Sequence, residues 1–264
     1  MSDNLLIGQF IRRDSVIHRL DPRTKLIGMV LLMIALIRLD SWIGYALASA
    51  FVLVTAGMSR FAPRLLLKGL LPVLPILAFT LLYHLFFGRG ETILWAYGGF
   101  VIRAEGMQEG VRLVWRILLM ILLASILTGT TRPMALAKGL ETLSKPLSRL
   151  GVPVEQFALM IVMAVRFIPT IGEELERILL AQKARGHDIS ALPPVKRLFA
   201  FIPILVPLLV TTVQRAEQLS LAIEARGYGD GRGRTVYRPL TFASSDYWAL
   251  SFLLVIGSIL WAIG

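Results

Sequence analysis

The sequence predicts an all-α integral membrane protein with about five transmembrane helices and a cytoplasmic region of long amphipathic helices. Hydrophobic residues make up 56% of the 264 residues, and the mean hydropathy is +0.70. Soluble domains contain about 45–50% apolar residues. Here the excess lies in blocks long enough to approach or complete a bilayer crossing. A second observation is that most Lys and Arg residues lie on what we expect to be one side of the membrane.

Five apolar blocks are the predicted spans. The polar N-terminal 25 residues contain no apolar core of a cleavable signal, so we expect the first block to direct its own insertion. That block is short, and we expect it to turn at residues 38–40 into the second. Pro72 and Pro75 are expected to kink the third, and Arg116 in the fourth can snorkel. The blocks are residues 26–39, 41–58, 65–87, 113–127 and 247–264.

The positions of the basic residues predict the orientation. We place the N-terminus in the cytoplasm, because cytoplasmic loops carry an excess of Lys and Arg. Of the 28 Lys and Arg residues, only Arg38, Arg89, Arg103 and Arg112 then lie outside, and Arg116 lies within a span. The short loops, which are the proper test of this rule, agree with the assignment.

Residues 88–110, which this orientation places outside, are rich in glycine and aromatic side chains. Residues 93–101, centred on Gly98-Gly99, predict a short β-hairpin. The sequence assigns no function to this segment.

Residues 131–246 contain two further apolar stretches that we do not interpret as spans. The first, residues 157–168, is short and contains Arg166, and the second, residues 198–213, contains two prolines. Both continue without a turn signal into charged helical sequence. A helix that is apolar at one end and amphipathic at the other fits a tilted helix along the inner membrane face.

The tripeptide Ala-Arg-Gly occurs at the end of each of these two helical segments. Each copy follows an Ala by three residues, and each Arg follows a Glu by nine. A Phe-Ile-Pro tripeptide precedes each copy. The distance from this tripeptide to the Ala-Arg-Gly motif is seven residues greater in the second copy than in the first. Seven residues are about two helical turns, so the Arg lies on nearly the same helix face relative to the Pro in both copies. Two spanning helices would place the motifs on opposite sides of the bilayer, whereas matched motifs favour two cytoplasmic ends.

The twin motifs have two interpretations. As ordinary helix ends, Arg favours the negative end of the helix dipole and Gly adopts the left-handed cap. As docking sites, each helix end presents one guanidinium, whose planar fork pairs with carboxylates or carbonyls in a groove on a partner. The two matched copies favour docking. The predicted binding residues are Ala184, Arg185, Gly186, Ala225, Arg226 and Gly227.

Residues 15–26 read Ser-Val-Ile-His-Arg-Leu-Asp-Pro-Arg-Thr-Lys-Leu, in which Asp21 and Pro22 predict a capped helix start. This string and the two Ala-Arg-Gly helix ends resemble the transmembrane T component, the EcfT/CbiQ family, of energy-coupling factor (ECF) transporters. The resemblance covers essentially the whole chain. It implies a non-catalytic subunit that couples two ABC ATPase subunits to a membrane-embedded substrate-capture (S) subunit for uptake of vitamins or related micronutrients. Carried over by position, Arg185 and Arg226 insert into grooves on the two ATPases.

We therefore expect three parts in a multi-pass protein of the bacterial cell membrane. Residues 1–130 form the N-terminal cytoplasmic segment and transmembrane helices 1–4. Residues 131–246 form cytoplasmic coupling helices, and residues 247–264 form the C-terminal transmembrane helix. The net charge of +11 is assigned to cytoplasmic loops and anionic membrane lipid rather than to nucleic acid, because no interleaved aromatic and basic pattern accompanies it.

Residue types that carry catalysis are sparse. The chain has no G-x-x-x-x-G-K-[ST] phosphate loop and no cysteine, and His18, His84 and His187 are scattered. We therefore predict no catalytic residue, cofactor or metal site, and ATP hydrolysis by partner subunits.

Three alternatives stay open. The chain could be a T subunit dedicated to a single cobalt, nickel or biotin importer rather than one shared by several capture subunits. It could be a membrane-embedded enzyme that uses Glu173, Glu174 and Glu176 for acid–base chemistry. A channel-like permease is disfavoured, because the long spans contain almost no polar residues besides Arg116 and His84. The sequence identifies neither the transported substrate nor the stoichiometry.

Overall fold

The computed structural model describes residues 14–60, 69–88, 90–97, 100–186, 193, 199–227 and 240–264. The chain divides into two compact units. The first unit is Met1–Thr142 with Leu240–Gly264, and the second is Leu143–Pro239. The first unit contains the five predicted spans, and the second contains the long helices that end in the two Ala-Arg-Gly motifs.

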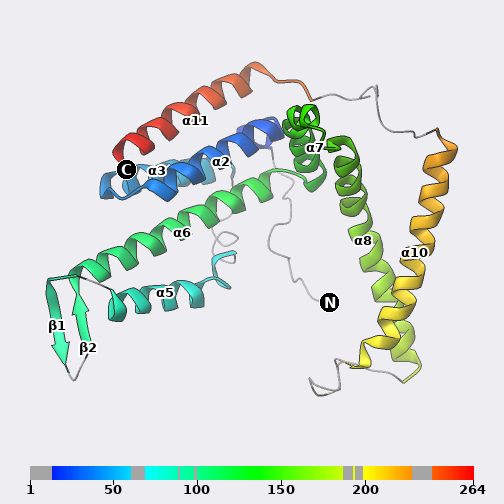
Figure 1. Cartoon of the computed structure of the whole chain (residues 1–264), viewed down its shortest axis with the longest axis horizontal. Coiled ribbons are helices and arrows are strands. Elements are labelled where there is room, and N and C mark those ends of the chain that lie inside the picture. Colours follow the sequence, from blue (N-terminus) through cyan, green and yellow to red (C-terminus); the bar gives the residue numbers. More distant parts are fainter. Residues whose placement is uncertain are drawn as a thin grey trace. The chain divides into compact units, whose positions relative to one another are not determined.

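In the first unit, α6 (Ala104–Thr130) is the helix on which the others assemble (Figure 1). It packs against α2 (Pro22–Arg38), α3 (Trp42–Met58) and α5 (Leu74–Phe87). The last helix, α11 (Ser244–Ile263), packs along α2, so a helix near the N-terminus contacts the helix at the C-terminus. The short α1 (Val16–Arg19) precedes α2, and α7 (Pro133–Ser144) follows α6.

The buried centre of the first unit joins α2, α3, α6 and α11. Leu36, Leu39, Val52 and Leu260 are almost completely buried there. The turn between α2 and α3 occurs where the sequence predicts it, because α2 ends at Arg38 and α3 begins at Trp42.

Arg116 explains how a charge is accommodated in the apolar stretch of α6. Its guanidinium donates to the Leu39 carbonyl oxygen at 2.6 Å and to the Tyr45 hydroxyl at 3.2 Å, and it pairs with Asp40 at 3.2 Å. The Tyr45 hydroxyl also donates to the Leu39 carbonyl oxygen, at 2.9 Å. Arg116 therefore satisfies the carbonyl that the end of α2 leaves open. The sequence predicts that this side chain snorkels toward the membrane surface, and the structure shows that it binds the turn between α2 and α3.

Two glycines set the close contact between α5 and α6. A Cβ atom at Gly106 would lie 2.6 Å from the His84 carbonyl oxygen and 2.9 Å from the Gly88 Cα. A Cβ at Gly110 would lie 2.9 Å from the His84 Cβ. Small residues four apart let helix backbones approach closely in a membrane, where hydrophobicity alone does not drive helices together. The spacing was visible in the sequence but was missed, because α6 was predicted to begin only at residue 113.

The region before α6 confirms the predicted hairpin and the predicted interruption at the prolines. Strands β1 (Ile93–Tyr97) and β2 (Phe100–Arg103) pair antiparallel, with Tyr97 opposite Phe100, which confirms the hairpin. Gly98 and Gly99 lie outside the described residues. The prolines interrupt the helix, as expected: residues 69–70 are helical, residues 71–73, which include Pro72, form a turn, and Pro75 lies in the first turn of α5, where proline needs no N–H partner. Residues 65–68 of that predicted span lie outside the described residues.

The all-α membrane class is confirmed. Within the described ranges the structure consists of helices and one short hairpin. Among the described helices, three are long and apolar enough to cross a membrane: α6, α11 and α8 (Val154–Ala184). Helices α3 and α5 are apolar but shorter. By length and composition α8 thus qualifies as a span, although the sequence predicts that it lies along the membrane face.

The second unit is built from two long helices, α8 and α10 (Ile202–Ala225), preceded by the 3₁₀ helix η1 (Lys145–Leu150). Each long helix runs unbroken from its apolar stretch into its charged stretch and includes an internal proline, Pro169 or Pro207. This confirms the predicted absence of a turn between the two stretches. The helices run in opposite directions and cross (Figure 1). Ala200 and Ile204 are buried at the crossing, against Leu175 and Ile178 of α8.

Candidate functional site

The two Ala-Arg-Gly motifs form the same backbone structure. Arg185 is the C-cap of α8 with φ −82° and ψ 7°, and Arg226 is the C-cap of α10 with φ −86° and ψ 7°. Gly186 and Gly227 follow with φ +85° and +70°. This left-handed conformation favours glycine because a Cβ atom is strained there. The predicted helix caps are therefore confirmed, and the similar backbone geometry at both ends accounts for the repeated glycine.

The cap uses the backbone and leaves the arginine side chains available. The Arg185 N–H donates to the Ala181 carbonyl oxygen at 3.2 Å, and the Arg226 N–H donates to the Ile223 carbonyl oxygen at 3.2 Å. Both side chains are exposed, and neither forms a hydrogen bond or ion pair with another described residue. An added Cβ at Gly186 would meet no atom within 4 Å, so the space around this helix end is open. The cap requires glycine, whereas no described residue binds the guanidinium.

The crossing of α8 and α10 places the two motifs far apart. Gln182, one turn before Arg185, donates to the carbonyl oxygen of Pro203 at the start of α10, at 3.3 Å. Arg226 lies at the other end of α10, whose 24 residues extend for about 36 Å at 1.5 Å per residue. One arginine therefore lies beside the beginning of α10 and the other lies at its end. One protein groove is too small to bind both.

The carboxylates of α8 do not form an acid–base site. Glu174 is half-buried and lies 3.9 Å from Arg177 and 4.0 Å from Arg215 of α10. Glu173 and Glu176 are exposed. The crevice beside Glu174 has a volume of only about 10 Å³. Glu174 is paired with arginines of both helices, and the crevice beside it is too small for a substrate.

The N-terminal string forms a buried polar cluster with the start of α11. Asp21 caps α2 and accepts from the Arg23 backbone N–H at 2.8 Å and from its guanidinium at 2.9 Å. Asp246 in turn accepts from the Asp21 N–H at 2.8 Å and the Thr24 hydroxyl at 3.3 Å. The Arg23 guanidinium carbon, Cζ, lies 3.9 Å from the centroid of the Phe242 ring. The predicted cap at Asp21 and Pro22 is confirmed, and its attachment to Asp246 is a contact that sequence reasoning missed.

The charge of Asp21 is stabilised by this cluster. Burial raises the pKa of the Asp21 carboxyl, but the hydrogen bonds and positive charge of Arg23 outweigh it and leave the pKa below its ordinary value. The Arg23 pKa is raised, chiefly by its hydrogen bond to Asp21. The pair therefore remains ionised at neutral pH, although both side chains are buried.

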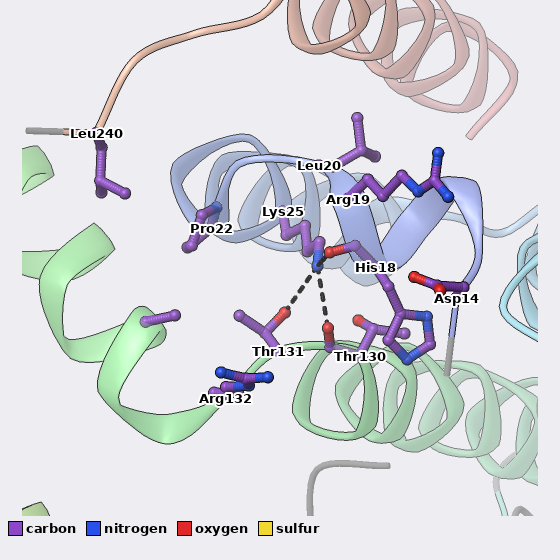
Figure 2. Close-up of a pocket in the computed structure, with 11 residues that line it drawn as sticks. Asp14, His18, Arg19, Leu20, Pro22, Lys25, Thr130, Thr131, Arg132 and Leu240 are labelled. Atoms are coloured by element: carbon purple, nitrogen blue, oxygen red, sulfur yellow. Dashed lines mark hydrogen bonds between the residues drawn. The ribbon is translucent and has the colours of Figure 1, made fainter. Parts of the chain in front are cut away.

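A basic cavity lies beside this cluster. Figure 2 shows the Lys25 ammonium group of α2 reaching the end of α6, where it donates to the Thr130 carbonyl oxygen and the Thr131 hydroxyl, both at 3.1 Å. The cavity has a volume of about 500 Å³. Arg19 and Arg132 also line it. The sequence motif from His18 to Lys25 therefore forms both a helix cap and one wall of a cavity.

These features define an all-α integral membrane protein that carries a separate pair of long, arginine-tipped helices. Known proteins are similar to this chain over nearly its whole length. Residues 13–237 match the CbiQ family, described as cobalt transport protein. The chain is 38% identical over 260 residues to the energy-coupling factor transporter transmembrane protein EcfT of Bacillus subtilis (strain 168), covering 98% of each chain.

Two further relatives carry the same name. The EcfT of Thermanaerovibrio acidaminovorans is 41% identical over 258 residues, which cover 97% of this chain and 94% of that protein. The EcfT of Brevibacillus brevis is 40% identical over 246 residues, 93% of each chain. The chain therefore belongs to the EcfT/CbiQ family, the transmembrane components of energy-coupling factor transporters.

Proposed function

We propose that this chain is the coupling subunit of an ECF-type importer. It transmits ATP-driven movements of two ABC ATPase subunits to a membrane-embedded capture subunit that binds a vitamin or related micronutrient. The observation that carries this proposal is the pair of exposed arginines in identical caps at opposite ends of one crossed helix pair. Two separated and equivalent contacts suit two similar partners.

Each guanidinium is suited to a groove that offers carboxylates or helix C-terminal carbonyls. Arginine presents its donors in a planar fork and always carries its charge. The left-handed glycine after each arginine ends the helix abruptly, so the side chain projects from a blunt tip. The binding residues are then the two tripeptides, Ala184, Arg185, Gly186, Ala225, Arg226 and Gly227.

To transmit movement from the ATPases, the arginine-bearing ends of α8 and α10 must move together with the point where the two helices cross. The buried contact of Ile204 with Leu175 and Ile178, and the ion pair of Glu174 with Arg215, tie α8 to α10 between the tips. When ATP closes the two ATPases, their grooves carry the arginine tips with them and change the angle of the crossing. This proposal requires both tips in the cytoplasm, as the basic loops favour, with the N-terminus on the same side.

The apolar faces of the same helices provide a surface for the capture subunit. Phe157, Met160 and Ile168 of α8 are 54%, 62% and 67% exposed, and Leu205 and Leu209 of α10 are about half exposed. Exposed apolar surface of this extent marks a protein or lipid contact. Movement of the crossing would then tilt a subunit bound to these faces within the membrane.

Two alternatives are a T subunit dedicated to one importer and a membrane-embedded enzyme. The family description, cobalt transport protein, is compatible with a T subunit dedicated to one importer. The similar proteins named EcfT favour a general coupling component. An enzyme that uses the α8 carboxylates is disfavoured, because Glu174 is paired with arginines and the adjacent crevice is too small for a substrate.

The test is reconstitution. The purified chain alone is expected neither to hydrolyse ATP nor to transport, and ATP-dependent uptake into vesicles is expected only when both ATPases and a capture subunit are present. Vesicles that lack only this chain should show hydrolysis uncoupled from uptake. Nucleotide hydrolysis by the isolated, ATPase-free chain would contradict the proposal and restore the enzyme hypothesis.

A further inference from the structure

Two cavities adjoin in the first unit, one basic and one apolar. The basic cavity, shown in Figure 2, lies between α1, the start of α2 and the end of α6. The apolar cavity has a volume of about 430 Å³ and lies between α1, α2, α3, α6 and α11. Leu20, Lys25 and Thr130 line both. The two cavities therefore lie on either side of these three residues.

The basic cavity has an excess of positive charge. Arg19, Lys25 and Arg132 line it together with one carboxylate, that of Asp14. The Lys25 ammonium donates to neutral oxygens, at Thr130, at Thr131 and at the His18 carbonyl at 3.5 Å. These bonds satisfy its hydrogens but do not neutralise its charge.

Two carboxylates of the neighbouring polar cluster line neither cavity. Asp21 binds the Arg23 guanidinium, and Asp246, whose negative charge also acts on Lys25, accepts from Thr24 and from backbone N–H groups. The charge of the cavity therefore suits an added anion with several oxygen acceptors, such as a phosphodiester.

The apolar cavity suits a hydrocarbon chain. Met29, Leu32, Phe51, Leu123 and Phe252 are among its lining residues, and nearly all of its lining surface is apolar. Its size is within the range of small-molecule sites, about 300–1,000 Å³. A cavity of this composition in a membrane protein excludes a free phosphate or a soluble nucleotide, but it accepts an acyl chain from the surrounding lipid.

We propose that the paired cavities bind one anionic phospholipid, with its phosphate beside Arg19, Lys25 and Arg132 and one acyl chain in the apolar cavity. Charge complementarity selects the headgroup, and the shared lining residues place the two parts of one amphipathic molecule within reach. The bound lipid would bridge α2, α6 and α11, which are the helices that assemble the first unit. The proposal does not depend on the docking role of the arginine tips.

The experiment is lipid retention by the full-length chain. The purified protein is equilibrated in detergent with phosphatidylglycerol and phosphatidylcholine of identical acyl chains, and native mass spectrometry counts the lipids that remain bound. We expect one phosphatidylglycerol to be retained in preference to phosphatidylcholine. In Arg19→Gln/Arg132→Gln the preference should fall about tenfold or more, since hydrogen bonds to charged groups are lost. Equal retention of the two lipids by the wild-type protein would overturn the proposal.

A matched variant separates site binding from general charge. Lys145→Gln/Arg149→Gln removes the same charge from exposed positions of η1 that line neither cavity, and should retain the lipid as the wild-type protein does. Equal loss in both double variants would reduce the effect to surface charge and overturn the site. Circular dichroism and size-exclusion chromatography check that each variant is folded.

Two further arms identify the occupant. Ala249→Phe fills the apolar cavity without changing its charge and should release the phospholipid, which also tests the proposal if the arginine variant does not fold. Soluble glycerol phosphate should not compete. Displacement by glycerol phosphate would identify a phosphate site instead of a lipid site. Loss of the lipid when the capture subunit binds would assign the apolar cavity to that protein.

Discussion

At the two Ala-Arg-Gly helix ends, the glycine provides the backbone conformation and the arginine provides the chemistry. The glycines adopt positive φ, and the arginine side chains are exposed without a partner among the described residues. The helix cap therefore requires the glycine but does not require the arginine side chain. Substitutions at Arg185 and Arg226 test the second requirement separately from the first.

We expect Arg185→Ala or Arg226→Ala to weaken assembly with the ATPases, and the double change to abolish uptake. Truncating one side of a buried charged contact costs about 2–5 kcal/mol, which is about 30- to several-thousand-fold in affinity. One loss is partly masked, because the second tip is tethered in the same chain. The measurement is pull-down of both ATPases followed by vesicle uptake.

Arg149→Ala is the matched control for these variants, because Arg149 is exposed and also lies shortly before a left-handed glycine, Gly151. It should assemble and transport normally. Lysine at 185 or 226 should restore little, since it lacks the planar fork. A double alanine variant that inserts, assembles and transports like the wild type would reduce both motifs to ordinary caps.

A second prediction at the residue scale concerns Asp21. Asp21→Asn leaves the buried Arg23 guanidinium without its counter-charge, and loss of one member of a buried pair costs about 3 kcal/mol. Chemical denaturation in detergent micelles, followed by circular dichroism, measures the free energy of unfolding. Glu109→Gln, an exposed change on α6, should leave it unchanged.

The same carboxylate predicts acid sensitivity. Because the folded-state pKa of Asp21 is lowered, its stabilisation is fully present above the unfolded-state value of about 4 and is lost as the pH falls below it. The unfolding free energy of the wild-type protein should therefore fall more steeply below about pH 4 than that of Asp21→Asn. Parallel pH profiles for the two proteins would show that Asp21 does not contribute this stability.

At the scale of elements, the pairing of α5 with α6 depends on glycine. Gly106→Ala places a methyl group against the backbone of residues 84 and 88, neither of which can rotate away as a side chain can. Such overpacking costs about 1–3 kcal/mol. Gly57→Ala on α3 is the matched change, because its Cβ would meet no atom within 4 Å. It should be neutral or slightly stabilising. Thermal unfolding of both variants in the same detergent measures the difference, and equal midpoints would contradict the glycine contact.

Element boundaries show where pattern reading was incomplete. The sequence predicts that the fourth span begins at residue 113, nine residues after α6 begins, because residues 104–112 are polar enough to resemble a loop, yet Gly106 and Gly110 are buried against α5. At Pro72 and Pro75 the sequence predicts a kink, and the structure has a turn at residues 71–73 between helical residues 69–70 and α5. Hydropathy locates apolar blocks, but it does not show which polar residues continue a helix beyond the membrane.

At the scale of the whole molecule, the orientation is tested by accessibility. The chain has no cysteine, so a single introduced cysteine reports its own position. Ala184→Cys and Ala225→Cys are preferable to changes at the glycines, whose positive φ a side chain would strain. Both should resist a membrane-impermeant thiol reagent in intact cells and react after lysis. Glu91→Cys, in the segment expected outside, should be labelled in intact cells, and labelling of either alanine position from outside would exclude cytoplasmic tips.

The sequence by itself determined the features that are local or periodic. The apolar blocks predict a helical membrane protein, the pair Asp21-Pro22 predicts the cap of α2, and the two glycines predict left-handed helix ends, because each depends on neighbouring residues along the chain. Only the tertiary structure decided which distant residues meet. Arg116 binds the turn after α2, Asp246 secures Asp21, and the antiparallel crossing separates Arg185 from Arg226. These contacts join residues that are tens to hundreds of positions apart in the sequence. Composition and periodicity describe only neighbouring residues, so they do not predict which distant residues lie close together.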